Sequence, residues 1–549
     1  MAERRNRILT VDHRYLVFPR WRDAGNPTSD AVSVAIDGEP YFAVGGAGLA
    51  SHEPDFYTFL DLDHARGREV TVEIEGENAD AIDLVRTADR IPSAYVPYGE
   101  PERPLVHFSP LRGWLNDPSG LLYLDGQWHL YYANNRFANR MAGPDNAWAH
   151  AVSPDLVHWR EVPLFLCPIR GTRSFWTGGA AIDIANTTGE GRPGSPVVVF
   201  SANNGSDAPN AFTQCVFVST DGGATCTLDP RRMYVPLPAE AHRRGGGTRD
   251  PMILWWEPER KWVMIVYNHP PEGRPSFFFF ESRDLLRWRE TSVLEDEFEC
   301  PNLVVLPVDG NPSDSRWVIW GSSSEYLVGS FDGSRFHPDG QGKLRTHHGP
   351  FTASQVFANA PVGRVVQVGW AHCCNSDREF SQMASFPLEL SLRSTGAGVR
   401  LHAEFVEEIR SLRLDGWQWS DVAIEVGALL IGDSAGPMEL RMELEPGSAR
   451  FLELSGSGLQ ASVDLRSGQV RVQGTRAIVP LGRDRLQIHL LLDVPSVELT
   501  IDGGSAYLLG ERAALDLRPR TPLQVKAKGG TLRIRKAEAY PLMSIYEKA

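Results

Sequence analysis

The sequence contains no apolar stretch that approaches the roughly 18 residues a membrane-spanning helix requires. Its first segment, MAERRNRILTVDHRYLVF, carries basic residues but no apolar run long enough for a secretory signal. We therefore expect no membrane partner and a cytoplasmic location, or secretion if a signal peptide has been removed.

Cysteine is scarce, with six residues in a chain of 549. The cysteines do not show the spacing of a metal-ligand set, and adjacent Cys373 and Cys374 are poor material for a disulfide framework. We expect reduced thiols, which agrees with a cytoplasmic location.

Positive charge is in deficit, because 55 lysines and arginines face 69 acidic residues and leave a net charge of −14. This balance argues against nucleic acid or an anionic membrane as a partner and suits a neutral substrate. Low-complexity segments are also missing. The remaining composition, 42% hydrophobic and 10% aromatic, is typical of a globular protein, and the length predicts two to four domains.

Short alternating segments typical of β-strands fill both ends of the chain. Residues 8 to about 95 alternate between turn residues every ten positions or so, which predicts a small antiparallel sandwich. The segment ADRIPSAYVPYGEPERPL then reads as a proline-rich connector. From about 410 to 549 the same pattern predicts a second, larger sandwich, reached through the helix-like link HAEFVEEIRSLRL.

A repeat occupies the middle of the chain. Strand-like pairs with Asp-Gly turns lead into Ser-x-Asp motifs at intervals of roughly 50 to 65 residues. The motifs begin at Ser153, Ser219, Ser282 and Ser330, with a weaker fifth at Ser394. Five units favour a five-bladed β-propeller, with a pair of β-sandwiches as the alternative. We predict an all-β protein with an N-terminal β-sandwich and linker (1–100), a propeller (101–405) and a C-terminal β-sandwich (406–549).

Three short stretches each place an acid just before an apolar, strand-like segment. They are WLNDPSG with Asp117, GTRDPM with Asp250 and FECPN with Glu299. The acids hold similar positions in three repeats, so a propeller would bring them to one mouth of its central channel. Glycoside hydrolysis requires two carboxyl groups flanking the scissile bond, one protonated and one ionised. The pattern therefore predicts a sugar hydrolase.

The three motifs, in this order, resemble the signatures of glycoside hydrolase family 32, the β-fructosidases. HFSPLRGWLNDPSGLLYLDGQWHLYY, HAVSPDLVHWREVP and SFPLELSLR are also similar to this family. The resemblance implies a five-bladed propeller with a C-terminal sandwich, a retaining mechanism, and neither a metal nor an organic cofactor. It also implies Asp117 as nucleophile, Glu299 as acid/base and Asp250 as transition-state stabiliser. The N-terminal sandwich resembles a module found ahead of the catalytic domain in some bacterial levanase-like members.

The neighbours of the acids suggest how the three carboxyl groups are tuned. Phe298 and Cys300 are expected to exclude water from Glu299 and to keep it protonated near neutral pH. Arg249 is expected to keep Asp250 ionised, and the alternative is a plain structural ion pair.

A further set of residues is predicted to bind the sugar, because aromatic faces suit sugar C–H surfaces and amides or hydroxyls suit sugar hydroxyls. For each tryptophan the alternative is core packing. The set is Trp114, Asn116, Asn135, Trp148, Trp176, Thr177 and Arg249. Where the family usually has Gln-x-Asn-Pro, this chain has Ala133 and Arg136 at the outer positions, so a hydroxyl-binding glutamine is missing. The reaction class is therefore better specified than the substrate.

The leading hypothesis is retaining hydrolysis of β-fructofuranosidic bonds in fructans, fructo-oligosaccharides or sucrose, through a covalent fructosyl-enzyme. A fructosyltransferase would share that intermediate, and an inverting hydrolase of another furanoside would differ in the separation of its carboxyl groups. A non-catalytic fructan-binding protein is a third class, disfavoured because all three acids are present. Oligomeric state stays open, as does the role of the N-terminal sandwich: glycan binding, packing on the propeller or a dimer contact.

Overall fold

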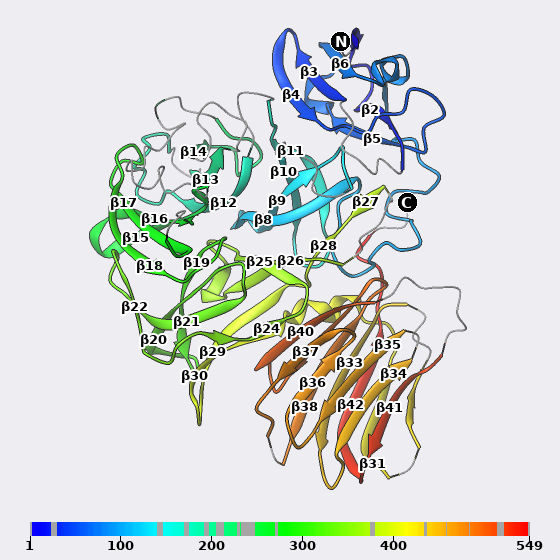
Figure 1. Ribbon diagram of the computed structural model, residues 1–549, viewed down its shortest axis with the longest axis vertical. Coiled ribbons are helices and arrows are strands. Elements are labelled where there is room, and N and C mark those ends of the chain that lie inside the picture. Colours follow the sequence, from blue (N-terminus) through cyan, green and yellow to red (C-terminus); the bar gives the residue numbers. More distant parts are fainter. Residues whose placement is uncertain are drawn as a thin grey trace.

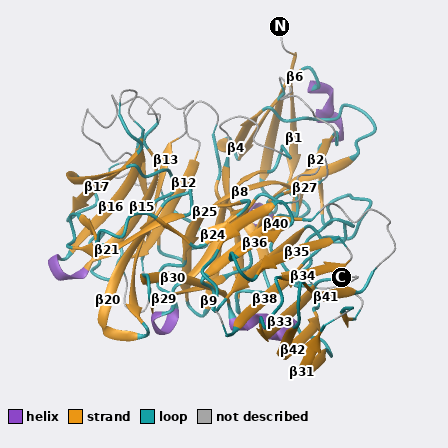
Figure 2. Cartoon of the chain, turned by 60° about the horizontal axis from the view of Figure 1, so that its bottom comes forward, coloured by secondary structure: helices purple, strands orange, loops and turns teal. Residues whose placement is uncertain are grey.

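In the residues that it describes, the computed structural model contains strands from end to end and, as helices, only short 3-10 turns (Figures 1 and 2). Among the residues it describes, no helix is long and apolar enough to cross a membrane. The described residues are 3–22, 30–139, 146–169, 175–191, 197–204, 213–227, 231, 247–269, 273–373, 379–425, 427–432, 436–456, 458–482, 484–512 and 521–546.

The N-terminal region is a two-sheet sandwich, as predicted, and lies at the top of Figure 1. Alternating apolar residues such as Val32, Val34, Val70 and Val72 face inward and form its core, so the period-2 pattern sets which side chains are buried. One sheet has the order β1 (Glu3–Thr10), β6 (Glu69–Gly76), β3 (Ala31–Ile36), β4 (Glu39–Gly45); the other β5 (Phe56–Asp61), β2 (Tyr15–Arg20), β7 (Arg86–Ala88). Two 3-10 helices, η1 (Asp63–Ala65) and η2 (Ala79–Leu84), complete it.

The described part of the middle region forms five blades, which confirms the predicted propeller. The first three blades are separate sheets: β8 (Gly113–Leu124), β9 (Gln127–Asn135), β10 (Ala147–Ser153) and β11 (Arg160–Leu166); then β12 (Phe175–Ile182), β13 (Val198–Asn204) and β14 (Gln214–Ser219); then β15 (Arg249–Trp256), β16 (Lys261–Asn268), β17 (Ser276–Ser282) and β18 (Arg289–Glu295), with η3 (Glu257–Glu259) between β15 and β16.

Blades four and five belong to one continuous sheet, because Val308 and Leu392 pair where the two blades meet. Blade four is β19 (Asn302–Val308), β20 (Asn311–Trp320), β21 (Glu325–Phe331) and β22 (Phe336–Pro338), with β23 (Leu344–Arg345) beside β21. Blade five is β25 (Phe351–Val356), β26 (Val366–Ala371), β29 (Leu388–Thr395) and β30 (Gly398–Phe405). In blade five β28 (Met383–Ala384) lies beside β26, and η4 (Pro361–Gly363) precedes β26. The short β27 (Phe380–Ser381) joins β8 of blade one, which links the last blade to the first.

The Ser-x-Asp repeat marks the same place in successive blades, because all five serines lie on the third strand. In the first three blades the serine hydroxyl bonds the aspartate two residues later, as Ser153 does with Asp155 at 3.1 Å. Asp155 in turn accepts the backbone N–H of Val157 and His158. The motif is thus a side-chain-stabilised turn that carries the chain from the third strand towards the blade's outer edge.

The C-terminal region is a second sandwich, at the lower right of Figure 1, reached through the 3-10 helix η5 (Glu407–Leu412). One sheet has the order β24 (His347–His348), β40 (Ala506–Glu511), β39 (Ser496–Ile501), β38 (Leu486–Leu492), β33 (Met438–Glu445), β42 (Leu532–Pro541), β31 (Trp417–Ile424); the other β32 (Leu429–Ile431), β41 (Leu523–Lys528), β34 (Phe451–Gly456), β35 (Leu459–Asp464), β36 (Gln469–Val472), β37 (Thr475–Ile478). Its edge strand β24 comes from the chain between blades four and five and pairs in parallel with β40.

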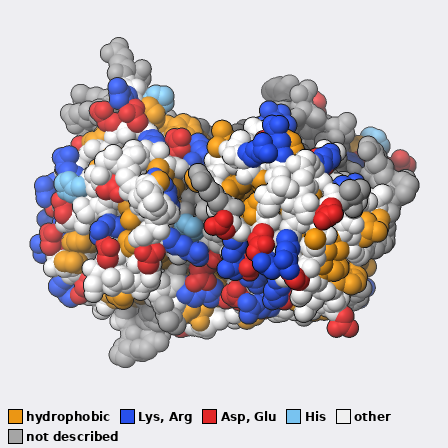
Figure 3. Space-filling model, turned by 90° about the horizontal axis from the view of Figure 1, so that it is seen from below, with side chains coloured by type: hydrophobic (Ala, Val, Ile, Leu, Met, Phe, Trp, Pro, Cys, Tyr) orange, Lys and Arg blue, Asp and Glu red, His pale blue; other side chains and the backbone are white. Residues whose placement is uncertain are grey.

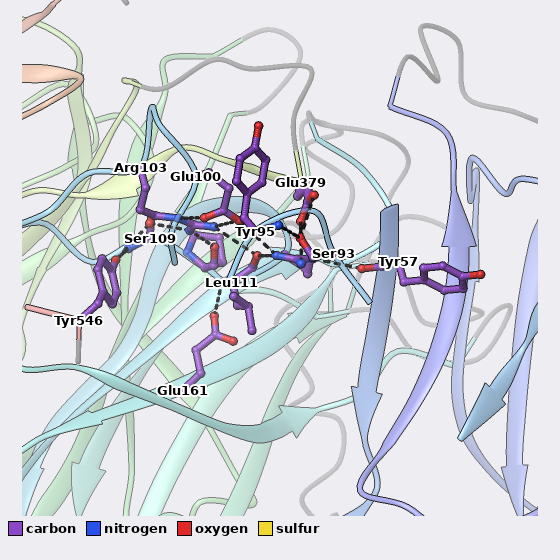
Figure 4. A network of polar contacts seen from close by, with 12 residues as sticks. Tyr57, Ser93, Tyr95, Glu100, Arg103, Ser109, Leu111, Glu161, Glu379 and Tyr546 are labelled. Carbon is purple, nitrogen blue, oxygen red and sulfur yellow. Dashed lines mark hydrogen bonds and ion pairs between the residues drawn. The ribbon is translucent and has the colours of Figure 1, made fainter. Parts of the chain in front are cut away.

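A buried polar network in the connector between β7 and β8 links the N-terminal sandwich, the propeller and the segment near the C-terminus (Figure 4). The Arg103 guanidinium bonds both oxygens of Glu100 and the hydroxyl of Ser109, which also contacts Tyr546 near the C-terminus. Ser93 bonds Glu379, just before β27. On the outer surface, acidic and basic side chains are interspersed over the face shown in Figure 3.

Candidate active site

The three predicted acids lie at the beginnings of blades one, three and four. Asp117 is on β8, Asp250 is the second residue of β15, and Glu299 lies just before β19. The first strands of neighbouring blades contact one another, as β8 does with β12 and β12 with β15. The blade geometry therefore brings residues far apart in the sequence to one end of the central channel.

The Cys300 thiol lies between two of the acids. Its Sγ is 3.8 Å from Oδ2 of Asp117 and 3.7 Å from Oδ2 of Asp250. The backbone N–H of Cys300 also donates to Oδ2 of Asp250 at 3.3 Å. The Arg249 guanidinium lies 3.7 Å from Asp250 and forms an ion pair with Glu299, so all three carboxyl groups converge on a single site.

The backbone at this site adopts a conformation that few residues tolerate. Asp250, Glu299 and Cys300 have φ of 58°, 46° and 47°, in the left-handed region that disfavours side chains. This conformation costs free energy in a residue that has a side chain, and it persists where the surrounding structure holds the backbone in place. Here the left-handed turn at 299–300 directs both the Glu299 carboxyl and the Cys300 thiol towards the site.

Glu299 occupies the more accessible side of the acid cluster. Its carboxyl forms an ion pair with Arg249 and accepts a hydrogen bond from Ser322 at 3.4 Å. The side chain is 29% exposed, and that of the adjacent Phe298 is itself exposed. The prediction that the neighbours of Glu299 exclude water from it is therefore wrong.

Burial determines the protonation of the two aspartates. It raises the pKa of Asp117 to about 6, although the Thr177 hydroxyl opposes the shift. Burial also raises the pKa of Asp250 to about 8, against the opposing charge of Arg249 and with a further increase from the charges of Glu299 and Asp117. The prediction that Arg249 keeps Asp250 ionised is thus wrong: the guanidinium is 3.7 Å from Asp250 but pairs more closely with Glu299.

Several residues predicted to bind sugar lie against the acids. The Thr177 hydroxyl donates to Oδ2 of Asp117 at 2.5 Å, so Thr177 orients the carboxylate. The Asn116 side chain accepts the backbone N–H of Asp117. Arg249 packs over the ring of Tyr267 at 4.6 Å, which fixes its guanidinium next to Glu299. Trp176 is half-buried at the start of β12.

The other predicted sugar-binding residues are more deeply buried. Trp148 has no exposed surface and donates its indole N–H to the Trp176 carbonyl, so it supports the site from behind, unlike the direct sugar contact predicted. Trp114 packs edge-on against Trp370. Asn135 lies opposite Trp114 across the β8–β9 pair, and its side-chain oxygen accepts the N–H of Phe137. Sugar contact by Trp114 and Asn135 stays a prediction.

The sequence interpretation missed several residues at the site. Cys300, which the sequence predicts only to shield Glu299, contacts Asp117 and Asp250, and its place inside FECPN is the signal for a direct role. Ser322 and Tyr267 carry no local motif, and only the fold brings them to Glu299 and Arg249. Gln355 of β25 accepts the N–H of Gly120 and donates to the Gly178 carbonyl, so it joins the strands of Asp117 and Thr177.

Comparison with known proteins places this site in a family. Residues 107–403, more than half of the chain, match the profile described as "Glycosyl hydrolases family 32 N-terminal domain". The chain belongs to glycoside hydrolase family 32.

Members of the family with curated names resemble this chain over its central region. A levanase of Bacillus subtilis is 29% identical over 439 residues, which are 74% of this chain and 60% of that protein. Invertase 1 of Saccharomyces cerevisiae is 32% identical over 295 residues, 49% of this chain and 53% of that protein. The chain thus spans somewhat more than half the length of these relatives.

Solved structures share the fold. An exo-inulinase from Aspergillus awamori matches with a TM-score of 0.70 at 22% identity, over 82% of this chain and all of that one. A β-fructofuranosidase from Schwanniomyces occidentalis matches with a TM-score of 0.68 at 21% identity, over 82% of this chain and 99% of that one. The family 32 propeller with its C-terminal sandwich is therefore confirmed.

Proposed function

We propose that this protein is a retaining glycoside hydrolase that cleaves β-fructofuranosidic bonds in fructans, fructo-oligosaccharides or sucrose. The observation that carries the proposal is the convergence of Asp117, Asp250 and Glu299 on one site, where the Cys300 thiol contacts both aspartates and Arg249 contacts Asp250 and Glu299. Family membership and the levanase and invertase relatives support a fructose-containing substrate.

Each acid has a distinct role in the proposed reaction. Oδ2 of Asp117 is held by Thr177 and Cys300, so we assign Oδ1 the attack on C2 of the fructosyl unit. As that ester bond forms, the bond from C2 to the leaving oxygen breaks. Glu299, which must carry a proton when substrate is bound, gives that proton to the leaving oxygen. Water then loses a proton to Glu299 and attacks C2, and the ester bond from C2 to Oδ1 of Asp117 breaks. The Asp117 carboxylate is restored, and fructose is released with retained configuration.

Asp250 is suited to grip sugar hydroxyls. Its raised pKa keeps it protonated at neutral pH, so it can donate a hydrogen bond as well as accept one. Arg249 adds a positive charge that holds the Glu299 carboxyl in place. The more exposed position of Glu299 suits a residue that meets first the leaving group and then water.

The test is a panel of sucrose, inulin, levan and short fructo-oligosaccharides, with products separated by chromatography. Wild-type protein should release fructose, and Asp117→Asn and Glu299→Gln should each lose about 10³-fold or more in kcat. The control is Asp314→Asn, which removes a partly exposed acid on blade four that pairs with Arg316. Fructose release that is unchanged in Asp117→Asn would refute the proposal, and longer products at high substrate would indicate transfer instead of hydrolysis.

A further inference from the structure

The strand that carries Asn135 ends inside the N-terminal sandwich. Two residues after Asn135, the Phe137 ring is buried in the sandwich core, with its centroid 5.1 Å from that of Phe18 and 5.7 Å from that of Phe42. Burying such a ring contributes about 2 kcal/mol or more. The propeller thus supplies a core residue to the sandwich two positions beyond the end of β9.

Arg136, between Asn135 and Phe137, is bound by β5 of the sandwich. The Thr58 hydroxyl donates to the Arg136 carbonyl at 2.7 Å, and this hydrogen bond is buried. The guanidinium lies over the Phe59 ring at 4.4 Å and reaches Glu161 at 3.4 Å. Arg136 stands where family 32 sequences usually have proline, so this departure from the family pattern coincides with a contact to the extra module.

The same strand of the sandwich also holds the segment that leads into β8. The Tyr57 carbonyl accepts a hydrogen bond from Nε of Arg112 at 3.1 Å. Glu161, beneath Arg136, accepts the N–H of Leu111 at 2.9 Å, a contact drawn in Figure 4. Three successive residues of β5 therefore fix the start of β8 and the end of β9.

These anchors lie next to the predicted sugar-binding wall. The Asn135 side chain is oriented by the N–H of Phe137, the anchored residue. Strands β8 and β9 approach so closely here that a Cβ on Gly113 would lie 2.2 Å from the Asn135 carbonyl oxygen. A shift at Arg136 would therefore displace Asn135 and, through β8, Trp114.

We propose that the N-terminal sandwich is a positioning element of the substrate site. Through Tyr57, Thr58 and Phe59 it fixes the ends of β8 and β9 that present Trp114 and Asn135 to the sugar. The inference rests on the proposed function, because it takes these two side chains to contact substrate. It answers the open question about the sandwich: its contact with the propeller serves sugar binding.

The sandwich should act on substrate affinity more than on chemistry. Asp117 lies on β8 within the irregularity of the β8–β9 pairing between Leu115 and Pro118, and its carboxylate is held by Thr177 of blade two. Glu299 is held by Arg249 of blade three. Loosening Asn135 should therefore raise KM and leave the turnover of bound substrate nearly unchanged.

The variant Thr58→Val tests this, because it removes the hydroxyl that bonds Arg136 and keeps the side chain's shape. We expect KM for the best substrate to rise about 3- to 10-fold, with kcat within about twofold of wild type. Thr58→Ser, which retains the hydroxyl, should restore KM. The matched control is Asn78→Ala, which removes a bond to Asp30 inside the sandwich and away from the propeller. It should lower Tm without raising KM.

Amide hydrogen exchange separates this inference from the proposed function. Residues 127–138 should exchange faster in Thr58→Val than in Asn78→Ala, whether or not any substrate is cleaved. If wild type releases no fructose from the panel, the proposed function fails and the exchange result alone decides the inference. Equal exchange in the two variants, or an unchanged KM in an active Thr58→Val enzyme, would overturn it.

Discussion

At the scale of single residues, the Thr177 hydroxyl is the group that most directly tunes the candidate nucleophile. Burial raises the pKa of Asp117 to about 6, and the hydrogen bond from Thr177 opposes that rise by stabilising the ionised form. The nucleophile must be ionised to attack. The rate should therefore fall as the pH is lowered through about 6. The apparent pKa of this acid limb belongs to the coupled carboxyl groups together.

Thr177→Val should move that limb to higher pH, because losing the hydrogen bond lets burial raise the pKa of Asp117 further. We expect a shift of about 0.5 to 1 pH unit in the profile of kcat/KM, and Thr177→Ser should keep the wild-type limb. Profiles of the three proteins over pH 4 to 9 provide the measurement. A limb that stays in place in Thr177→Val would show that another group controls the acid side.

At the scale of elements, one side chain connects three blades. Gln355 on β25 bonds the Gly120 N–H of β8 at 3.0 Å and the Gly178 carbonyl of β12 at 2.9 Å. Asp117 and Thr177 lie on these two strands within three residues of the bonded glycines. The relative placement of the carboxylate and the hydroxyl that orients it thus depends on a strand from the last blade.

Gln355→Leu should leave both backbone groups without this partner. We expect a loss of about 1–3 kcal/mol of stability and a fall in kcat of roughly tenfold. The control is Gln367→Leu on β26, whose amide is also buried but bonds Ser354 within blade five. Thermal melts and steady-state rates on both variants give the measurement. Equal effects on kcat would contradict a specific link to the acids.

The propeller and the approximate position of its site could be predicted from local sequence. The Ser-x-Asp turns follow the third strand of the first three blades, and each acid lies in or shortly before a first strand, so the repeat places Asp117, Asp250 and Glu299 at one end. The placement of the Cys300 thiol could not be predicted, because it depends on two left-handed residues in succession. The burial of Trp148 and the pairing of Arg249 with Glu299 are likewise set by packing between blades.

At the scale of the whole molecule, a buried charge cluster joins the propeller to the C-terminal sandwich. His107, just before β8, is 2.7 Å from Asp493 and 2.9 Å from Glu498, and all three side chains have no exposed surface. Burial alone would lower the pKa of His107, but the two carboxylates raise it to about 9. The imidazolium therefore stays charged at neutral pH and compensates two acids of the sandwich.

His107→Gln should destabilise the protein by about 3 kcal/mol at pH 6, because it removes the cation that contacts both buried carboxylates. The folded-state pKa lies above the ordinary value of 6.5, so this stabilisation is complete below pH 6.5 and is lost as pH rises through about 9. The difference in Tm between wild type and variant should thus shrink between pH 7 and pH 9.5. A difference that is constant over this interval would contradict a charged His107.

The strand β24 has a consequence for how the propeller and the C-terminal sandwich unfold. In the sequence it lies between blades four and five, yet it covers the edge of the C-terminal sheet by pairing with β40. An uncovered edge would be a template for association with other chains, so the propeller shields its neighbour from aggregation. Separating the sandwich from the propeller would expose that edge. We therefore expect heating to unfold the propeller and the C-terminal sandwich in a single cooperative transition.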